Sequence, residues 1–388
     1  MENIVFDDTM NLMVGERIVD SLPFVLAQKN CQKVMIVCDE PAYRLGYVDI
    51  VTHAFAYASI DVEYVYKNVG DVATVRDVEE IKKKYKHYKC DCIVAIGKKA
   101  AIMAAKGAKT LIVDGTNYVS HYVNDKLSDY QADNTILVTI PTNFGSGFEA
   151  LPIARIYDNI NNFVYEFTTH YSSTDIMVLD TAMTDIIPPK AIATFGLFAL
   201  DMSLECFIKD DTPMIGKAYA DAAIGIIFKY LTKCIFKNAN REYRQKILEA
   251  VGFASCGYAM LEKNKLLSPL SDIISDKYLA NYANIYTILF RQYIKSVDVE
   301  RAFGYSLNSM VEPNDYALYA KEARIQKTLA QIEGLYQKIE NCVDYNSKLR
   351  DFGVTEEDLD EIAESFMINN DEESIVKEDV MQLLRACL

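Results

Sequence analysis

Histidine and tryptophan are scarce in this chain of 388 residues, which has four histidines and no tryptophan. All four histidines lie at or before residue 170, so the rest of the chain offers no imidazole for a transition metal or a serine triad. Basic residues are outnumbered, with 40 Lys and Arg against 55 Asp and Glu and a formal net charge of −15. Proteins that coat nucleic-acid phosphates carry the opposite charge, so we expect no nucleic-acid partner.

Long apolar runs are absent as well. The longest, at 191–200, is about half the length of a membrane-spanning helix. The first eight residues contain three acidic side chains and no basic one, unlike a secretory signal. Nine scattered cysteines, an odd number, argue against a disulfide framework. We therefore expect a cytoplasmic protein with reduced thiols and no membrane partner.

The first half of the chain alternates short apolar runs with helical patterns. The apolar runs lack polar alternation, as do strands that are covered on both faces. We expect strands at Val34–Cys38, Val62–Tyr66, Cys92–Ile96, Leu111–Val113 and Ile136–Ile140. Helical patterns at Val75–Tyr88 and Ala100–Lys106 lie between them. Strands that alternate with crossover helices predict a doubly wound parallel sheet.

The pattern changes after residue 150. Two β-rich runs, Ile153–Tyr157 and Phe163–Phe167, flank a polar turn and predict a hairpin. Beyond residue 188 only helical patterns remain, at Lys190–Ile208, Met214–Phe236, Glu242–Glu262, Pro269–Ile294 and Asp315–Cys342, with two more that begin near Thr355 and Ser374. We expect an α/β domain at 1–187 and an all-helical domain at 188–388.

Two strand-to-helix turns carry candidate ligand-binding groups, because ligands of open α/β sheets bind at the carboxyl ends of the strands. The first reads Gly97-Lys98-Lys99-Ala100 and follows a buried strand. The second, Pro141 to Glu149, is rich in Gly, Thr and Ser, whose N–H and hydroxyl groups could face a phosphate or a ribose. From these residues alone, a purely structural turn and a ligand-binding loop both remain open.

The same segments resemble the iron-containing alcohol dehydrogenases, within the fold group of dehydroquinate synthase. That family's D-x-I-I-A-I-G-G-G-S-x-x-D-x-A-K stretch aligns with 91–106, and its I-P-T-T-A-G-T-G-S-E loop aligns with 140–149. The resemblance covers nearly the whole chain and also includes Cys38-Asp39, Gly46, Asp180, Pro188-Pro189, Gly196 and Gly353-Val354. It implies a dehydroquinate synthase-like fold: an N-terminal doubly wound parallel sheet and an all-α C-terminal domain.

The resemblance implies NAD or NADP as cofactor, and the sequence does not choose between them. The positions that match the family's cofactor-binding residues are Asp39, Gly97, Lys98, Lys99, Thr142, Asn143, Ser146 and Leu179. Only Gly97 remains of the family's three glycines, and a Cβ with a long side chain hinders the close approach of a pyrophosphate. Lys98 and Lys99 could instead bind phosphate as point charges, or be solvated residues of an empty turn.

The family's divalent metal ion, held by an Asp and three His, lacks its ligands in this sequence. The matching positions are Phe198, Met202, Asn264 and Tyr278. We therefore expect no metal. If chemistry persists, a protein acid must replace the ion, and the candidate catalytic residues are Asp201, Lys265 and Tyr278.

Three functions follow from the resemblance. We expect the chain to be either a divergent NAD(P)-dependent oxidoreductase of alcohols or polyols, or a catalytically inactive member with a binding, regulatory or assembly role. The third possible function is that of a lyase or synthase like dehydroquinate synthase, which also needs a divalent metal ion. Expected partners are a small alcohol, an aldehyde or a nucleotide, and the resemblance adds a homodimer.

Overall fold

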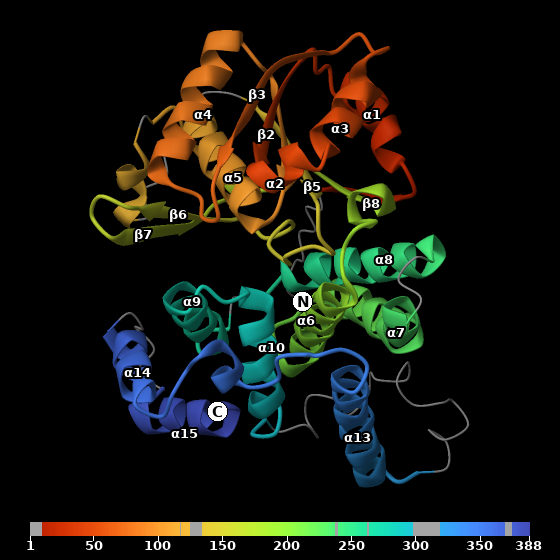
Figure 1. The fold of residues 1–388 in the computed structure, drawn as a ribbon, viewed down its shortest axis with the longest axis vertical. Coiled ribbons are helices and arrows are strands. Elements are labelled where there is room, and N and C mark those ends of the chain that lie inside the picture. The colour runs from red at the N-terminus through yellow and green to blue at the C-terminus, as the bar shows by residue number, and fades with distance from the viewer. Residues whose placement is uncertain are drawn as a thin grey trace, which may run out of the picture. The chain divides into compact units, whose positions relative to one another are not determined.

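The computed structural model describes residues 10–116, 118–124, 134–236, 240–261, 264–297, 319–368 and 375–388. The chain divides into two compact units, Met1–Ile186 and Ile187–Leu388, and each is described by itself (Figure 1).

The first unit is built on a six-stranded sheet in the order β1-β8-β5-β4-β2-β3. All neighbouring strands are parallel. The strands are β1 (Asn11–Gly15), β2 (Lys33–Asp39), β3 (Asp61–Val69), β4 (Cys92–Gly97), β5 (Ile136–Pro141) and β8 (Ile176–Asp180). The expected parallel sheet is confirmed, whereas β1 and β8 were not predicted.

Helices cover both faces of the sheet, which explains the continuous apolar strands. The elements are α1 (Leu22–Gln28), α2 (Glu40–Arg44), α3 (Tyr47–Phe55), α4 (Val75–Tyr88) and α5 (Lys99–Asp114). Alternate residues of β2 and β4, such as Ile36 and Val94, form one core with α1 and α3. The helices α4 and α5 lie on the opposite face (Figure 1). The doubly wound arrangement is therefore confirmed.

The expected strand at Leu111–Val113 is wrong, because these residues belong to α5. Every residue of α5 from Ala100 to Asp114 is buried, so the helix lacks the polar face that reveals a helix in a sequence. A short apolar run inside it is then indistinguishable from a buried strand. Gly107 belongs there because a Cβ would lie 2.9 Å from side-chain atoms of Ile156 and Val78.

The predicted hairpin is confirmed as an antiparallel pair, β6 (Ile153–Asp158) and β7 (Phe163–Thr168). Asp158 accepts hydrogen bonds from the N–H groups of Ile160 and Asn161, which closes the polar turn. Short segments of 3-10 helix also lie at Ile18–Ser21, Val119–Asn124, His170–Ser172, Thr181–Thr184 and Leu349–Phe352.

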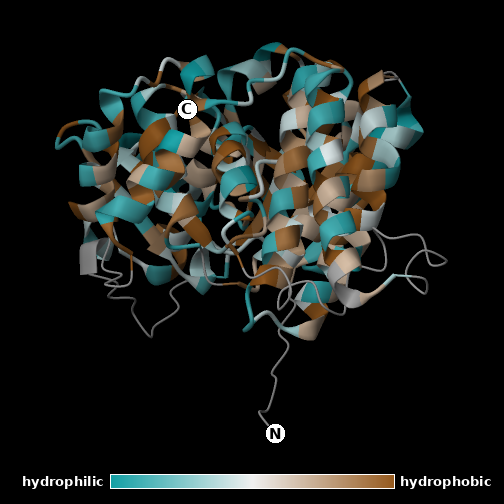
Figure 2. Cartoon of the chain, turned by 90° about the horizontal axis from the view of Figure 1, so that it is seen from below, coloured by the Kyte–Doolittle hydropathy of each residue, from teal (hydrophilic) through white to brown (hydrophobic). Residues whose placement is uncertain are grey.

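The second unit is helical in its described residues. Its helices are α6 (Pro189–Ile208), α7 (Met214–Phe236), α8 (Arg241–Tyr258), α9 (Leu267–Lys277), α10 (Tyr282–Tyr293), α13 (Lys321–Glu340), α14 (Asp358–Ile368) and α15 (Lys377–Cys387). The central α6 is long and apolar enough to cross a membrane, but 89% of its most apolar window is buried inside the protein. Most of the outer helices carry both hydrophilic and hydrophobic residues (Figure 2), as helices with one buried face do.

The expected helix at Pro269–Ile294 is wrong as a single element, since α9 ends at Lys277 and α10 begins at Tyr282. Leu279 has a φ of +50°, and the Asn281 side chain accepts the Asn284 N–H as an N-cap. The helix expected to begin near Thr355 is α14, which begins at Asp358, and the Thr355 N–H and hydroxyl both donate to the Asp358 carboxylate. The ends of other predicted helices at Glu262, Asp315 and Ser374 lie outside the described residues.

Candidate functional site

The carboxyl ends of three adjacent strands are tied together by hydrogen bonds. The strand β2 ends at Asp39, β4 at Gly97 and β5 just before Thr142. The Lys98 N–H donates to Asp39 Oδ2 at 2.7 Å, and the Thr142 N–H donates to the Gly97 carbonyl at 3.1 Å. The sheet therefore brings together four of the predicted cofactor-binding residues.

Asp39 holds this junction in one conformation. It is only 3% exposed, and its Oδ1 accepts the Ala42 N–H at 2.8 Å as the N-cap of α2. Gly97 has a φ of +146°, and a Cβ there would lie 2.4 Å from Asp39 Oδ2. Only glycine fits at position 97, because the carboxylate fills the space that a side chain would need.

The N-terminus of α5 lies at the same place. Lys98 is its N-cap residue and makes no side-chain capping hydrogen bond. The first turn of α5 therefore presents backbone N–H groups and the positive end of the helix dipole, which together favour an anion. The Lys98 side chain is exposed, whereas the Lys99 ammonium lies 4.1 Å from the centre of the Phe148 ring.

The loop at 142–149, called the β5 loop here, is shaped by its own polar groups. The Asn143 side chain accepts the Gly145 N–H at 3.0 Å. Ser146 donates its N–H and its hydroxyl to Glu149 Oε1, at 2.7 and 2.9 Å. Thr142, Asn143 and Ser146 are each at most 9% exposed. Leu179, the remaining predicted residue, is buried in β8 next to β5.

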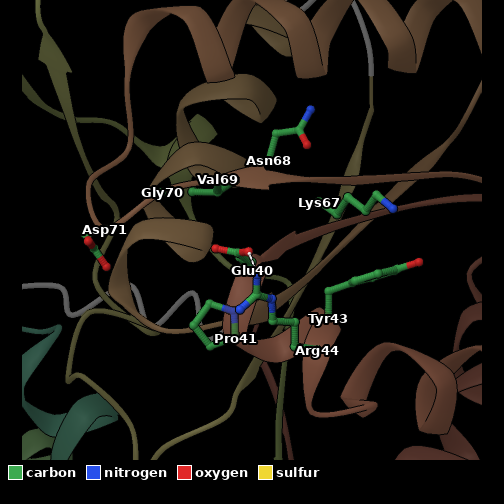
Figure 3. Close-up of a pocket in the computed structure, with 9 residues that line it drawn as sticks. All are labelled: Glu40, Pro41, Tyr43, Arg44, Lys67, Asn68, Val69, Gly70 and Asp71. Atoms are coloured by element: carbon green, nitrogen blue, oxygen red, sulfur yellow. Dashed lines mark ion pairs between the residues drawn. The ribbon is translucent and has the colours of Figure 1, made fainter.

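A solvent-open groove of about 570 Å³ lies at the carboxyl ends of β2 and β3 (Figure 3). The Lys67 ammonium lies 4.3 Å from the centre of the Tyr43 ring, and Arg44 pairs with Glu40 at 2.6 Å. The groove adjoins Asp39, because its wall includes the following helix α2. Sequence reasoning missed it, since its lining comes from two separate segments: Glu40, Pro41, Tyr43, Arg44, Lys67, Asn68, Val69, Gly70 and Asp71.

In the helical unit, three of the four positions that the sequence predicts to match the family's metal ligands, Phe198, Met202 and Asn264, are filled by buried side chains. The Phe198 ring centre lies 5.9 Å from that of Tyr282 and 5.2 Å from that of Tyr286, both edge-on. Met202 is 1% exposed. Asn264 uses its side-chain oxygen to accept two backbone N–H groups, at 3.0 and 2.9 Å. Across the described ranges, no three His, Cys, Asp or Glu residues come close enough to hold a metal ion. This donor set does not fit iron or zinc.

Two buried carboxyl groups, Asp201 and Glu205, lie one turn apart on α6. Asp201 accepts hydrogen bonds from the hydroxyls of Thr287, at 2.6 Å, and Tyr336. Glu205 accepts one from the Tyr286 hydroxyl. Burial raises the pKa of both carboxyl groups, and the hydroxyl donors oppose this only in part.

The three candidate catalytic residues have different surroundings. Asp201 is enclosed by α6, α10 and α13, whereas the Lys265 side chain is exposed. Tyr278 is half-buried at the end of α9, where burial and the nearby Asp358 carboxylate raise the pKa of its hydroxyl to about 12. Their catalytic roles stay predictions.

Known proteins resemble part of the chain in sequence and nearly all of it in structure. Residues 10–181 match the family model described as iron-containing alcohol dehydrogenase. Aldehyde-alcohol dehydrogenase 2 of Entamoeba histolytica is 26% identical over 249 residues, which are 62% of this chain and 28% of that protein. The chain thus spans little more than a quarter of that curated relative.

Solved structures resemble the whole chain. Sulfoacetaldehyde reductase from Bifidobacterium kashiwanohense, in complex with NAD⁺, has a TM-score of 0.81 at 15% identity, with 99% of each chain covered. Alcohol dehydrogenase from Oenococcus oeni has a TM-score of 0.83 at 18% identity, covering 97% of this chain and 98% of that one. Residues 10–181 thus match the family model of the iron-containing alcohol dehydrogenases, and the whole chain shares the fold of these solved structures.

Proposed function

We propose that this chain binds a pyridine dinucleotide, NAD(H) or NADP(H), at the carboxyl edge of its parallel sheet, and that it holds no resident iron or zinc. One observation carries the first part: three strand ends meet at the N-terminus of α5, which has no side-chain cap and has an exposed lysine beside it. A doubly charged pyrophosphate is the cofactor group that such a site suits.

Each part of the edge has a role in this proposal. The first-turn N–H groups of α5 bind the pyrophosphate, and Lys98 contributes a positive charge in place of a close backbone approach. Asp39 lies beside the groove at 40–44 and 67–71, which leaves room for the adenosine half of the cofactor. The β5 loop supplies Thr142 and Ser146 near the nicotinamide half of the cofactor. When bound, the nicotinamide ring supplies hydride transfer.

The packing around Phe198 supports the proposal that the chain holds no resident iron or zinc. A metal that polarises the substrate oxygen lowers the barrier of alcohol oxidation, and this chain has aromatic and amide groups at the matching positions. We therefore propose that the chain acts as a cofactor-binding family member, in a regulatory or assembly role, rather than as a metal-dependent dehydrogenase. The cytoplasm as its location rests on the nine free cysteines, and a homodimer rests on the resemblance alone.

A metal-independent oxidoreductase of alcohols or aldehydes is the second candidate. The raised pKa of Asp201 favours it, because a carboxyl group that keeps its proton can act as an acid. In the described structure this group is fully buried, so the reaction would require α6, α10 or α13 to move.

Calorimetric titration with NADH, NADPH and ADP-ribose tests the binding site. The variant Lys98→Glu should weaken binding about tenfold or more, because it replaces a phosphate-binding charge by a repulsive one. Lys83→Glu is the matched control, since it makes the same charge change on the exposed face of α4 and should leave binding unchanged. No binding to the wild type, or equal effects of both variants, would refute the site. Cofactor oxidation with a panel of alcohols and aldehydes separates the two candidates.

A further inference from the structure

A fully buried lysine lies under the β5 loop. Lys106 belongs to the second turn of α5 and is 0% exposed. Its ammonium donates to the carbonyls of Phe148, at 2.7 Å, Glu149, at 3.1 Å, and Leu151. These three bonds use all three N–H groups of the ammonium, and its described hydrogen-bond acceptors are backbone carbonyls at the end of the β5 loop and just beyond it.

The Lys106 ammonium, called the anchor here, is placed to control the shape of the β5 loop. The first residue of the loop is bonded to Gly97, just before α5 begins, and its far end is bonded to Lys106, within α5. Glu149 connects the middle of the loop to this anchor, because its side chain accepts both bonds from Ser146 while its carbonyl accepts a hydrogen bond from the Lys106 ammonium. The end of β4 and the helix α5 that follows it thus fix the two ends of the segment that carries Thr142 and Ser146.

Burying the ammonium group costs free energy even though three carbonyls accept its hydrogen bonds, because burial removes the charge from water. Burial lowers the pKa of Lys106 to about 7, the Glu149 carboxylate opposes this shift, and Lys109 adds to it. When the proton leaves, the amine has two N–H groups for three carbonyls, and its lone pair faces an oxygen. The anchor therefore weakens within the physiological range of pH.

We propose that Lys106 is the positioning residue of the β5 loop: its charged form holds the loop in the conformation that binds the cofactor, and its neutral form releases it. The identity of the ligand rests on the proposed function, whereas the effect on the loop does not.

Lys106→Met tests the proposal, with Lys109→Met as the matched control. Lys109 lies one turn further along α5, is 6% exposed and bonds instead to the Ser173 carbonyl and the Asp175 carboxylate. Amide hydrogen exchange, corrected for the intrinsic pH dependence of exchange, reports the loop directly. The wild-type β5 loop should lose about tenfold in protection across neutral pH, while the β6–β7 hairpin stays constant.

In Lys106→Met the loop should be weakly protected at every pH. In Lys109→Met the loop should keep its pH-dependent protection, with the loss moved to higher pH because Lys109 no longer lowers the pKa of Lys106. Wild-type protection that is independent of pH, or equal loop protection in both variants, would overturn the proposal. The wild-type pH series decides the matter even if Lys106→Met fails to fold. Parallel titration with NADH should show affinity falling in the same pH range, and a wild type that binds no dinucleotide refutes the proposed function while the exchange data still judge Lys106.

Discussion

The aromatic packing around Phe198 predicts a large effect of the substitution Phe198→Ala. The side chain is 3% exposed, and its ring contacts Tyr282 and Tyr286 edge-on. Truncation of a buried phenylalanine costs about 3–5 kcal/mol. Two edge-on aromatic partners, each contributing about 0.5–1.5 kcal/mol, place the expected loss near 4 kcal/mol.

Urea denaturation followed by far-UV circular dichroism measures this loss. The transition of the helical unit should move to lower urea, while the transition of the α/β unit should keep its midpoint. Phe236→Ala is the control, because Phe236 lies at the end of α7, is 66% exposed and should cost less than about 0.5 kcal/mol. A loss below about 1 kcal/mol for Phe198→Ala would show that the ring does not fill a packed site, and would refute the reasoning.

Two further predictions concern Asp201 and Gly97. Burial raises the pKa of Asp201, so the stability that its proton contributes is fully present below the pKa of the unfolded chain and is lost as the pH rises through the folded value. Asp201→Asn, which does not titrate, should gain in melting temperature relative to the wild type as the pH rises, and a difference that is constant with pH would contradict this. Gly97→Ala should cost at least about 1 kcal/mol in denaturation, because of its positive φ and the clash with Asp39, whereas Gly334→Ala, in open space on α13, should stabilise by about 0.5–1 kcal/mol.

The parts of the fold that depend on local pattern could be predicted from the sequence. Val75–Tyr88 has the predicted bounds because its periodicity and its Thr74 capping box are local, and Met214–Phe236 has the predicted bounds as well. The strand at Leu111–Val113 was wrong because a helix buried on all sides has no polar face. The break between α9 and α10 has neither Gly nor Pro, so Asn281 as an N-cap was the only signal.

Some features of the candidate site could be predicted from the sequence, and others needed the structure. The turns after β4 and β5 could be found because their Gly, Lys, Thr and Ser residues follow buried strands. The role of Lys106 could not, since a lysine between Ala105 and Gly107 in a helix gives no sign of the loop whose carbonyls it binds. The groove beside Asp39 also needed the structure, because sheet order brings residues 40–44 and 67–71 together.

Metal analysis of protein purified without chelators tests the central claim most directly. The positions that the sequence predicts to match the family's metal ligands include Phe198, in an edge-on aromatic cluster, and Asn264, whose amide is bonded to the backbone. Inductively coupled plasma mass spectrometry should find iron and zinc far below one ion per chain, and no shift of melting temperature when either is added. One tightly held ion per chain would contradict the account.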